Sequence, residues 1–541
     1  MTQRFFNTSG PVVPADHYCV PPLERFDLEE VQRLIRAKRY FVLHAPRQTG
    51  KTSALLALRD LLNGSGEYRC LYVNVEAGQS ARGDVDAAMR AILGRMATLA
   101  QVTLKDDYPK GIWQETLAAY GGHGALGELL TRWSMADTRP LVLFIDEIDS
   151  LVGDTLISML RQLRAGYDER PEAFPQSVIL CGVRDVRDYR IHSGSTREII
   201  TGGSAFNIKA KSLRLGDLGE ADVRALLVQH TAETGQAFTE SALATVWRQT
   251  RGQPWLVNAL AYQACFENRA GRNRTRAIGK EEVLEAQEEL ILSRQTHLHQ
   301  LADKLEEPRV RRVIEPMLSG GERAFTARDV EYVRDLGLIA RDAPVRVANP
   351  IYAETIPREL TLAVQEGLVQ EAAWYVRADG GLDMDALLAA FQRFYRDHSE
   401  HATVQVPYRE AAAQLLLQAF LQRIVNGGGR IEREYALGRR RTDLLIVWPP
   451  GKLGGGDGRH AGRGEAAQPP HRHVIECKIL RGSLDATVRG GVEQTLDYMD
   501  RCGGESGHLV IFDRDGDKSW EQKLFRREES RGGRTVTVWG A

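Results

Sequence analysis

The segment YFVLHAPRQTGKTSALLALRD, residues 40–60, contains three successive patterns. Apolar residues fill positions 40–44 as in a buried strand, turn-forming residues follow, and leucines then recur at helical spacing. Two further apolar runs, LYVNVE at 71–76 and SVILCGVRD at 177–185, alternate with helical stretches. This alternation predicts an α/β domain with a doubly wound parallel sheet and helices on both faces.

The loop in this segment has the pattern of a phosphate-binding P-loop, with alanine in place of the first glycine. Backbone N–H groups and the helix N-terminus would hold the phosphates of ATP. Lys51 would reach the outer phosphates, and the Thr52 hydroxyl would ligate Mg²⁺. The residues expected to surround the nucleotide are Ala45, Pro46, Arg47, Gln48, Thr49, Gly50, Lys51, Thr52 and Ser53.

A second apolar run, LVLFIDEIDS at 141–150, ends in two acidic residues. We expect Asp146 to hold Mg²⁺ through water and Glu147 to orient or deprotonate the attacking water, which indicates a hydrolysing site. Arg184, at the end of the 177–185 strand, has two interpretations. It could sense the γ-phosphate, or the sequence RDVRDYR could be a solvated turn with internal ion pairs.

Composition limits the classes of protein to be considered. A chain of 541 residues with 43% apolar and 26% charged content predicts several domains. The net charge of -1 excludes a globally basic nucleic-acid binder but leaves local basic patches open. No apolar run is long enough to span a bilayer and the start lacks a secretory pattern, so a soluble cytoplasmic protein without a membrane partner is expected. The scattered cysteines indicate neither disulfides nor a zinc site.

The motifs of the first 360 residues together resemble the AAA-like ATPases of the STAND group, which are P-loop switches. The matching segments are FNTSGPVVPADHY, APRQTGKT, LFIDEID, GVRDVRDY and RGQPWLVNALA. In that group a Gly-x-Pro motif in the helical lid couples nucleotide state to lid position, and Gly252, Gln253 and Pro254 match it. The alternative interpretation is a helix break beside a buried tryptophan.

The resemblance implies a modular organisation. An ATPase core is expected over residues 1–215, a helical lid over 216–300 and a winged-helix module over 301–360, followed by a helical linker over 361–404. Within the winged-helix module, the segment VRVANPIYAETIPREL at 345–360 is predicted to form a short hairpin. Arg309, Arg311 and Arg312 leave DNA contact by the winged helix open, whereas in this group the module more often packs against the nucleotide domain.

The segment HVIECKIL, residues 473–480, places two charged residues within an apolar strand. Alternation puts Glu476 and Lys478 on one face and the neighbouring apolar residues on the other. An earlier strand pair, RIEREYALGRRRTDLLIVWP at 430–449, would bring Asp443 to the same sheet edge. The two carboxylates and the backbone carbonyl of Cys477 form an oxygen site suited to Mg²⁺, beside which a lysine can position the attacking water.

This arrangement resembles the PD-(D/E)xK nuclease superfamily, whose motif is Asp443 followed by Glu476 and Lys478. The resemblance covers about residues 405–541 and implies a small α/β/α nuclease fold. Glu410, or alternatively Glu434, would supply a further acidic ligand. Gln494 and Tyr498 lie one helical turn apart and match a supporting pair of the superfamily, or they are an ordinary helix surface.

A Gly/Pro-rich insert separates Trp448 from His473, and a loop tolerates it at modest entropic cost. The arginine run Arg439, Arg440 and Arg441 would form a basic rim for the phosphate backbone, or a solvated face. The Glu-x-Lys spacing of Glu476 and Lys478 occurs a second time, at Glu521-Gln522-Lys523. This second segment lies in a charged stretch without an apolar strand, so it serves as a comparison for the first.

The sequence thus predicts an ATP-dependent switch that controls a Mg²⁺-dependent nuclease, with Mn²⁺ as an alternative metal. The resemblance to conflict-system ATPases suggests a role in defence against foreign DNA. Nucleic acid is the expected partner, DNA before RNA, and a homo-oligomer is left open. The first alternative is a signalling or scaffold ATPase whose C-terminal domain binds nucleic acid or protein without cleavage. The second is a DNA-remodelling ATPase that acts through the winged helix.

Overall fold

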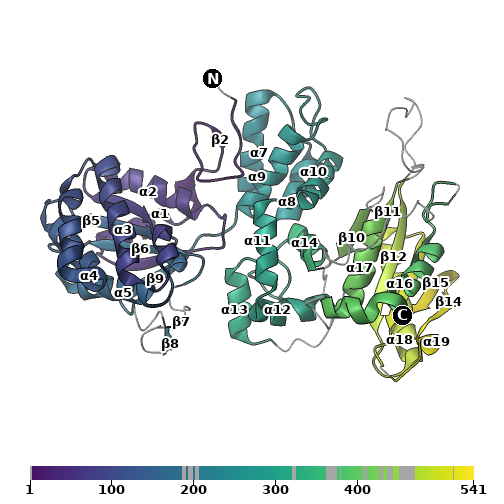
Figure 1. Ribbon diagram of the computed structural model, residues 1–541. Helices are drawn as coiled ribbons and strands as arrows, with labels where there is room; N and C mark the ends of the chain where they lie inside the picture. The colour runs from purple at the N-terminus through teal and green to yellow at the C-terminus, as the bar shows by residue number, and fades with distance from the viewer. Residues whose placement is uncertain are drawn as a thin grey trace. The chain divides into compact units, whose positions relative to one another are not determined.

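The computed structural model describes residues 3–541 except 186–189, 193–198, 202–205, 320–324, 361–374, 378, 406–410, 426–429, 435–442, 450–468 and 516. Side chains at 190–192, 199–201, 296, 319, 398–405, 423–425, 430, 432–434 and 443 are also outside the description. The chain forms two compact units (Figure 1), Met1–Ser293 with Asp335–Gly337 and Arg294–Arg334 with Leu338–Ala541. Within the described ranges, no helix has both the length and the apolar character required to cross a membrane.

The first unit contains a five-stranded sheet in the order β4-β5-β6-β3-β9, and all its neighbouring strands are parallel. The predicted parallel α/β sheet is therefore confirmed. The strands are β3 (Tyr40–His44), β4 (Arg69–Asn74), β5 (Leu141–Asp146), β6 (Ser177–Gly182) and β9 (Lys209–Arg214). The helices of this layer structure are α1 (Leu28–Arg36), α2 (Lys51–Ser65), α3 (Val85–Leu99), α4 (Tyr108–Met135) and α5 (Gly153–Ala165).

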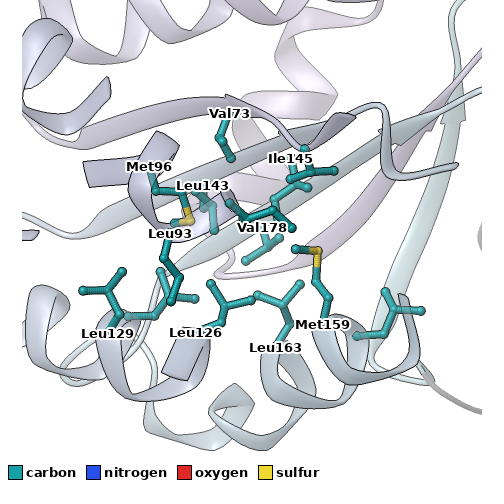
Figure 2. Packing of buried hydrophobic residues seen from close by; sticks show 14 of the residues in the cluster. Val73, Leu93, Met96, Leu126, Leu129, Leu143, Ile145, Met159, Leu163 and Val178 are labelled. Carbon is teal, nitrogen blue, oxygen red and sulfur yellow. The ribbon is translucent and has the colours of Figure 1, made fainter. Parts of the chain in front are cut away.

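Two apolar cores lie on opposite faces of this sheet. On one face Leu143 and Ile145 of β5 pack with residues of α3, α4 and α5, and Figure 2 shows these side chains meeting between strands and helices. On the other face Val142 and Phe144 pack with residues of α1 and α2. Because helices cover both faces, the central strands are apolar at nearly every position, as parallel strands generally are.

The described helices that follow the sheet in the first unit include α7 (Glu220–Thr234), α8 (Glu240–Thr250), α9 (Pro254–Tyr262) and α10 (Lys280–Leu292), and α7 and α9 contact the N-terminal segment. Short strands β1 (Phe5–Phe6) and β2 (His17–Tyr18) pair in parallel, and Phe6 and Tyr18 both pack against His230 of α7. The indole nitrogen of Trp255 donates to the Thr8 carbonyl at 2.8 Å. The N-terminal segment is thus fixed to these helices.

The Gly-Gln-Pro motif forms the start of α9. Gly252 has φ +78°, and a Cβ atom there would lie 1.9 Å from the Leu218 carbonyl oxygen. The Gln253 side chain caps α9 by accepting from the Leu256 N–H at 2.6 Å, and Pro254 occupies the first helical position. The structure of this turn therefore explains why glycine, glutamine and proline occur at these three positions.

The second unit begins with α11 (Thr296–Leu305), α12 (Pro308–Ser319), α13 (Ala327–Asp335) and α14 (Pro350–Leu360). The segment 345–360 was predicted as part of a short hairpin. In the structure one antiparallel bridge, Ile339 with Val347, precedes it, and most of the segment is helix α14, which starts with a proline. This part of the winged-helix prediction is wrong.

Two arginines considered for DNA contact are engaged within the second unit. Arg309 and Arg312 of α12 both donate to the buried carboxylate of Asp329 on α13, at 3.1 and 3.0 Å. These bonds lower the pKa of Asp329 to about 2, with the Arg312 bond as the leading cause. The guanidinium groups therefore fasten two helices together.

The C-terminal part of the second unit is a six-stranded mixed sheet in the order β10-β11-β12-β13-β15-β14. Helix α16 (Met384–Gln405) packs on one face, where Phe391 meets Phe512, and α18 (Leu484–Cys502) packs on the other. Helix α17 (Ala412–Val425) contacts α16 through Phe420 and Phe391. The strands are β10 (Arg430–Glu434), β11 (Asp443–Trp448), β12 (His471–Ile479), β13 (Ser506–Phe512), β14 (Phe525–Arg531) and β15 (Arg534–Gly540).

Helix α16 lies in the region predicted as a linker, but it belongs to the C-terminal fold. The Gln392 amide on this helix donates to the carbonyls of Phe525 and Gly540 at 3.0 and 2.7 Å. Strand β14 forms one edge of the sheet, and its sequence FRREESR is mostly charged and partly exposed. The layers are therefore helix, sheet, helix, with α16 as a structural component.

The close approach at Gly252 predicts a large and specific loss of stability. We expect Gly252→Ala to reduce the free energy of unfolding by about 3 kcal/mol, because a steric overlap adds to the cost of a left-handed alanine. Gly235→Ala is the matched control: φ is +76° there, but no atom lies within 4 Å of the added Cβ. It should lose only about 1–2 kcal/mol. Thermal unfolding measures both, and equal losses would contradict the packing argument.

Candidate functional site

The loop between β3 and α2 has the backbone conformation of an anion cradle. Gln48 and Gly50 have positive φ values of 57° and 90°, and the loop passes directly into α2. Because Gly50 precedes the helix without a side-chain cap, the N–H groups of the first turn stay available to a ligand. Ala45, the departure from the usual first glycine, is fully buried below the loop.

Lys51 places a positive charge in this loop. Its ammonium group donates to the carbonyl oxygens of Ala45 and Pro46 at 3.0 and 2.9 Å, and the residue is 6% exposed. Thr49 also donates to the Pro46 carbonyl, which stiffens the turn. Lys51 forms no salt bridge within the described part of the chain. A buried cation held only by neutral oxygens favours binding of an anion.

Asp146 lies at the end of β5 and is completely buried. Its Oδ2 atom accepts from the Thr52 hydroxyl at 2.8 Å and from the Tyr72 hydroxyl at 2.8 Å. Its Oδ1 atom accepts from the Glu147 N–H at 2.9 Å, and the thiol of Cys181 also bonds to this carboxylate. The predicted Thr52 and Asp146 therefore meet.

Tyr72 was not predicted as a site residue. The segment LYVNVE indicated only a strand, and Tyr72 reaches Asp146 because β4 pairs directly with β5. Knowledge of this strand order, combined with the alternation of side chains, is the signal that would have found it.

Glu147 follows Asp146 in a left-handed backbone conformation, with φ 56° and ψ 39°. Such a conformation is costly for a residue other than glycine and concentrates at functional sites. Burial raises the pKa of Glu147, the nearby carboxylates of Asp149 and Asp146 add to the increase, and Lys51 opposes it. A carboxylate with a raised pKa is a stronger base once ionised.

The other residues predicted for this site differ in burial and in their contacts. The Ser53 hydroxyl accepts from the Val12 N–H at 2.9 Å, so it holds the N-terminal segment, and Arg47 is exposed. Arg184 is half-buried directly after β6. The next residue, Asp185, is buried and pairs with Lys209 of β9 at 2.6 Å, so the start of this turn is fixed to the sheet.

The C-terminal sheet buries an acidic residue at a predicted position. Glu476 is 1% exposed, and its Oε1 atom accepts from the Lys478 ammonium at 2.5 Å. Its Oε2 atom is buried and has no hydrogen-bond partner among the described residues. Burial raises the pKa of Glu476, and the charge and hydrogen bond of Lys478 oppose the increase. The site is therefore short of positive charge.

The backbone brings further predicted positions beside Glu476. Strands β11 and β12 are antiparallel with Leu444 opposite Ile475, so Asp443 is placed next to the Glu476 position on the neighbouring strand. Glu434 is paired with Asp443 in the β10–β11 register. The side chain of Cys477 lies on the opposite face from Glu476, which leaves its carbonyl oxygen as the potential ligand.

Several predictions lie outside the described residues. Glu410, Arg439, Arg440 and Arg441 fall in undescribed ranges, as do the side chains of Asp443 and Glu434. Across the residues that are described, no three His, Cys, Asp or Glu side chains gather as a metal-binding group. The acidic cluster at this sheet edge therefore stays a prediction.

Helix α18 covers the sheet face that carries Glu476. Tyr498 is buried in the apolar core with Val474 of β12 and Leu509 of β13. Gln494, one turn earlier, is half-buried, and its Oε1 atom is buried without a hydrogen-bond partner in the described part of the chain. Tyr498 thus serves packing, while Gln494 directs a free acceptor into the protein.

The second segment with this spacing, Glu521-Gln522-Lys523, differs from the segment that contains Glu476. Glu521 and Lys523 lie on the short helix α19 (Trp520–Lys523), and Glu521 is exposed. The same spacing of acid and lysine therefore gives an exposed glutamate at one position and a buried glutamate paired with its lysine at the other.

No family model matches the chain, and no curated protein matches it. Solved structures with some likeness include the Walker-type ATPase PABY2304 of Pyrococcus abyssi, with 13% identity over 65% of this chain and 99% of that chain and a TM-score of 0.41. The RuvB Holliday junction branch migration motor of Thermotoga maritima has 14% identity over 61% and 95%, with a TM-score of 0.33. Cdc6p from Pyrobaculum aerophilum has 16% identity over 64% and 94%, with a TM-score of 0.34. These scores are low, and the assignment of a P-loop α/β fold rests on the strand order and loop geometry described above.

The raised pKa of Glu476 predicts that this residue destabilises the metal-free protein at neutral pH. We expect Glu476→Gln to increase the free energy of unfolding in EDTA at pH 7 by about 0.5–2 kcal/mol, because a neutral amide replaces a poorly compensated buried charge. The gain should shrink as the pH falls, since wild-type Glu476 then becomes protonated. Glu521→Gln, at the exposed acid, should change stability by less than about 0.5 kcal/mol. A destabilised Glu476→Gln protein would contradict this assignment.

Proposed function

We propose that the first unit binds and hydrolyses ATP. The observation that carries this proposal is the buried Lys51 ammonium, which is held by two backbone carbonyl oxygens of the loop and forms no salt bridge with a described acidic residue. A triphosphate supplies the missing negative charge, and the open N-terminus of α2 supplies N–H donors to its oxygens.

The residues around the loop would have different roles in ATP hydrolysis. Lys51 would bind the outer phosphates and offset the charge that develops on them. Glu147 would accept a proton from the attacking water, a role that its raised pKa favours. Arg184 remains a candidate for contact with the γ-phosphate.

The chemistry of the loop also fits Mg²⁺. Asp146 is a buried carboxylate that forms no salt bridge with any described lysine or arginine, and Thr52 donates its proton to it. The lone pairs of the Thr52 oxygen therefore stay free for a hard cation. When bound, Mg²⁺ would neutralise charge on the phosphates during transfer.

We further propose that the C-terminal sheet carries a Mg²⁺-dependent nuclease. This is supported by the buried, unpartnered Oε2 atom of Glu476, the ion pair with Lys478 and the neighbouring backbone position of Asp443. A divalent cation would satisfy the free carboxylate oxygen, and the free Oε1 atom of Gln494 is a further acceptor in this layer. Lys478 would orient the attacking water and offset charge on the scissile phosphate.

DNA is the proposed substrate before RNA, a preference that rests on the resemblance to PD-(D/E)xK nucleases. ATP binding or hydrolysis in the first unit would then control cleavage, a coupling suited to defence against foreign DNA. The alternative is a signalling ATPase whose C-terminal domain binds nucleic acid or protein without cutting. A remodelling ATPase acting through α12 is disfavoured, because Arg309 and Arg312 already neutralise Asp329.

Two substitutions should separate ATP binding from hydrolysis. Lys51→Ala should weaken ATP binding about 10- to 100-fold, since it removes charge-assisted hydrogen bonds. Glu147→Gln should preserve binding and reduce kcat about 10²- to 10⁴-fold through loss of the base. The acid limb of wild-type kcat should lie above the pH expected for an ordinary glutamate, because its pKa is raised. Glu169→Gln, at an exposed glutamate of the same unit, is the control.

Cleavage of nucleic acid tests the second proposal directly. Purified full-length chain should cut circular or linear DNA with Mg²⁺ or Mn²⁺, and Lys478→Ala should reduce the rate about 10²- to 10³-fold. Lys523→Ala, the lysine of the exposed comparison segment, should leave cleavage unchanged. Lys51→Ala should alter the ATP dependence of cleavage, and RNA of the same sequence tests substrate class.

The outcomes distinguish the alternatives. Cleavage that survives Lys478→Ala would exclude this site as its source. DNA binding without cleavage at any metal or ATP concentration would favour the signalling or scaffold function.

A further inference from the structure

Tyr72 contacts the nucleotide site but belongs to none of its sequence motifs. Its hydroxyl donates to Asp146 Oδ2 at 2.8 Å, the same oxygen that accepts from Thr52 at 2.8 Å. The side chain is half-buried, and its ring packs against the core that contains Phe144 and Leu55. One ring thus combines core packing with a bond to the most deeply buried carboxylate of the site.

The strand register explains how Tyr72 reaches this carboxylate. In the parallel β4–β5 pair, Tyr72 lies opposite Phe144 and Asn74 lies opposite Asp146. The hydroxyl must therefore extend along the neighbouring strand by two residues, about 6.6 Å of strand rise. A phenol spans that distance, whereas a serine or threonine hydroxyl at position 72 does not.

The burial of Asp146 explains why the hydrogen bond from Tyr72 matters. Asp146 is fully buried and forms no salt bridge in the described chain, so its two oxygens are held by neutral hydrogen-bond donors. The Thr52 hydroxyl is one of them, and it is also the group expected at the metal. Tyr72 holds Oδ2 independently of Thr52, while the Glu147 N–H holds Oδ1.

We propose that Tyr72 is a positioning residue for the Mg²⁺ site, fixing the orientation of the Asp146 carboxylate. The inference rests on the proposed ATPase function. Two hydroxyl groups on Oδ2 and one N–H group on Oδ1 prevent rotation of the carboxylate unless several bonds break together. Groups that orient metal-binding carboxylates typically change metal affinity about 10- to 100-fold when removed.

This role differs from that of a tyrosine that serves packing alone. The Tyr72 hydroxyl bonds to Asp146, whereas the ring packs against the apolar core, so the two parts of the side chain can be tested separately. A packing residue would lose nothing when only its hydroxyl is removed. A positioning residue would lose metal affinity and leave the phosphate cradle intact.

The test is the coupling between Mg²⁺ and nucleotide in Tyr72→Phe. The affinity of the full chain for a fluorescent, non-hydrolysable ATP analogue is measured in EDTA and in saturating Mg²⁺, and the ratio of the two dissociation constants gives the coupling. We expect the affinity in EDTA to stay within about twofold of wild type and the coupling to fall about tenfold. The melting temperature in EDTA verifies that the variant is folded.

Tyr40→Phe is the matched control. Tyr40 lies on β3 of the same sheet and is fully buried, and its hydroxyl donates to the Pro175 carbonyl at 2.9 Å. Its loss should change neither the affinity in EDTA nor the coupling. Thr52→Val, which removes an expected metal ligand, is the positive control and should also abolish most of the coupling.

Each other result would overturn the inference. Unchanged coupling in Tyr72→Phe would make the hydroxyl incidental. An equal loss of affinity in EDTA and in Mg²⁺ would make Tyr72 a structural support of the loop. If wild type binds no nucleotide, the proposed ATPase function fails and this inference fails with it, whereas binding by wild type with unchanged coupling in the variant overturns the inference alone.

Discussion

The burial of a carboxylate is the constraint around which the nucleotide site is built. Asp146 is completely enclosed, and its oxygens are held by groups from α2, β4, β5 and β6. Because each donor comes from a different element, the carboxylate fixes the register between the sheet and the P-loop helix. The hydrogen bonds that compensate for the burial of Asp146 therefore also set the position of the carboxylate in the proposed nucleotide site.

The C-terminal sheet meets the same constraint incompletely. Among the described residues Glu476 has one ionic partner and one buried oxygen without a hydrogen bond, and burial raises its pKa. A fold selected for stability alone would place an apolar side chain at such a position. The cost is consistent with a site kept for binding, and Glu521, with the same spacing to a lysine, shows that the chain also has an inexpensive way to place this pair.

Local patterns predicted the parts of the molecule that depend on neighbours in sequence. The strand, loop and helix around Lys51 and the acidic end of β5 follow from short segments, and the parallel sheet follows from their alternation. Contacts between distant segments could not be read in this way. The contact of Tyr72 with Asp146 depends on the order of β4 and β5 in the sheet. The Ser53 hydroxyl accepts a hydrogen bond from the Val12 N–H, and α16 packs on a sheet whose strands come later in the chain. The segment 345–360 was assigned to a hairpin because short apolar runs are ambiguous between strand and helix, and the structure forms an antiparallel bridge at Val347 and a helix over Pro350–Leu360.

Strand β14 has a consequence for how copies of the chain meet in solution. An exposed sheet edge offers unpaired N–H and C=O groups to any extended chain that approaches it. Here Arg526 and Glu528 on one side of the strand, and Arg527 and Glu529 on the other, form ion pairs with their neighbours. A second copy adding a strand would have to remove these charged side chains from water and disturb their ion pairs. The edge thereby resists the strand-by-strand growth that leads to aggregation.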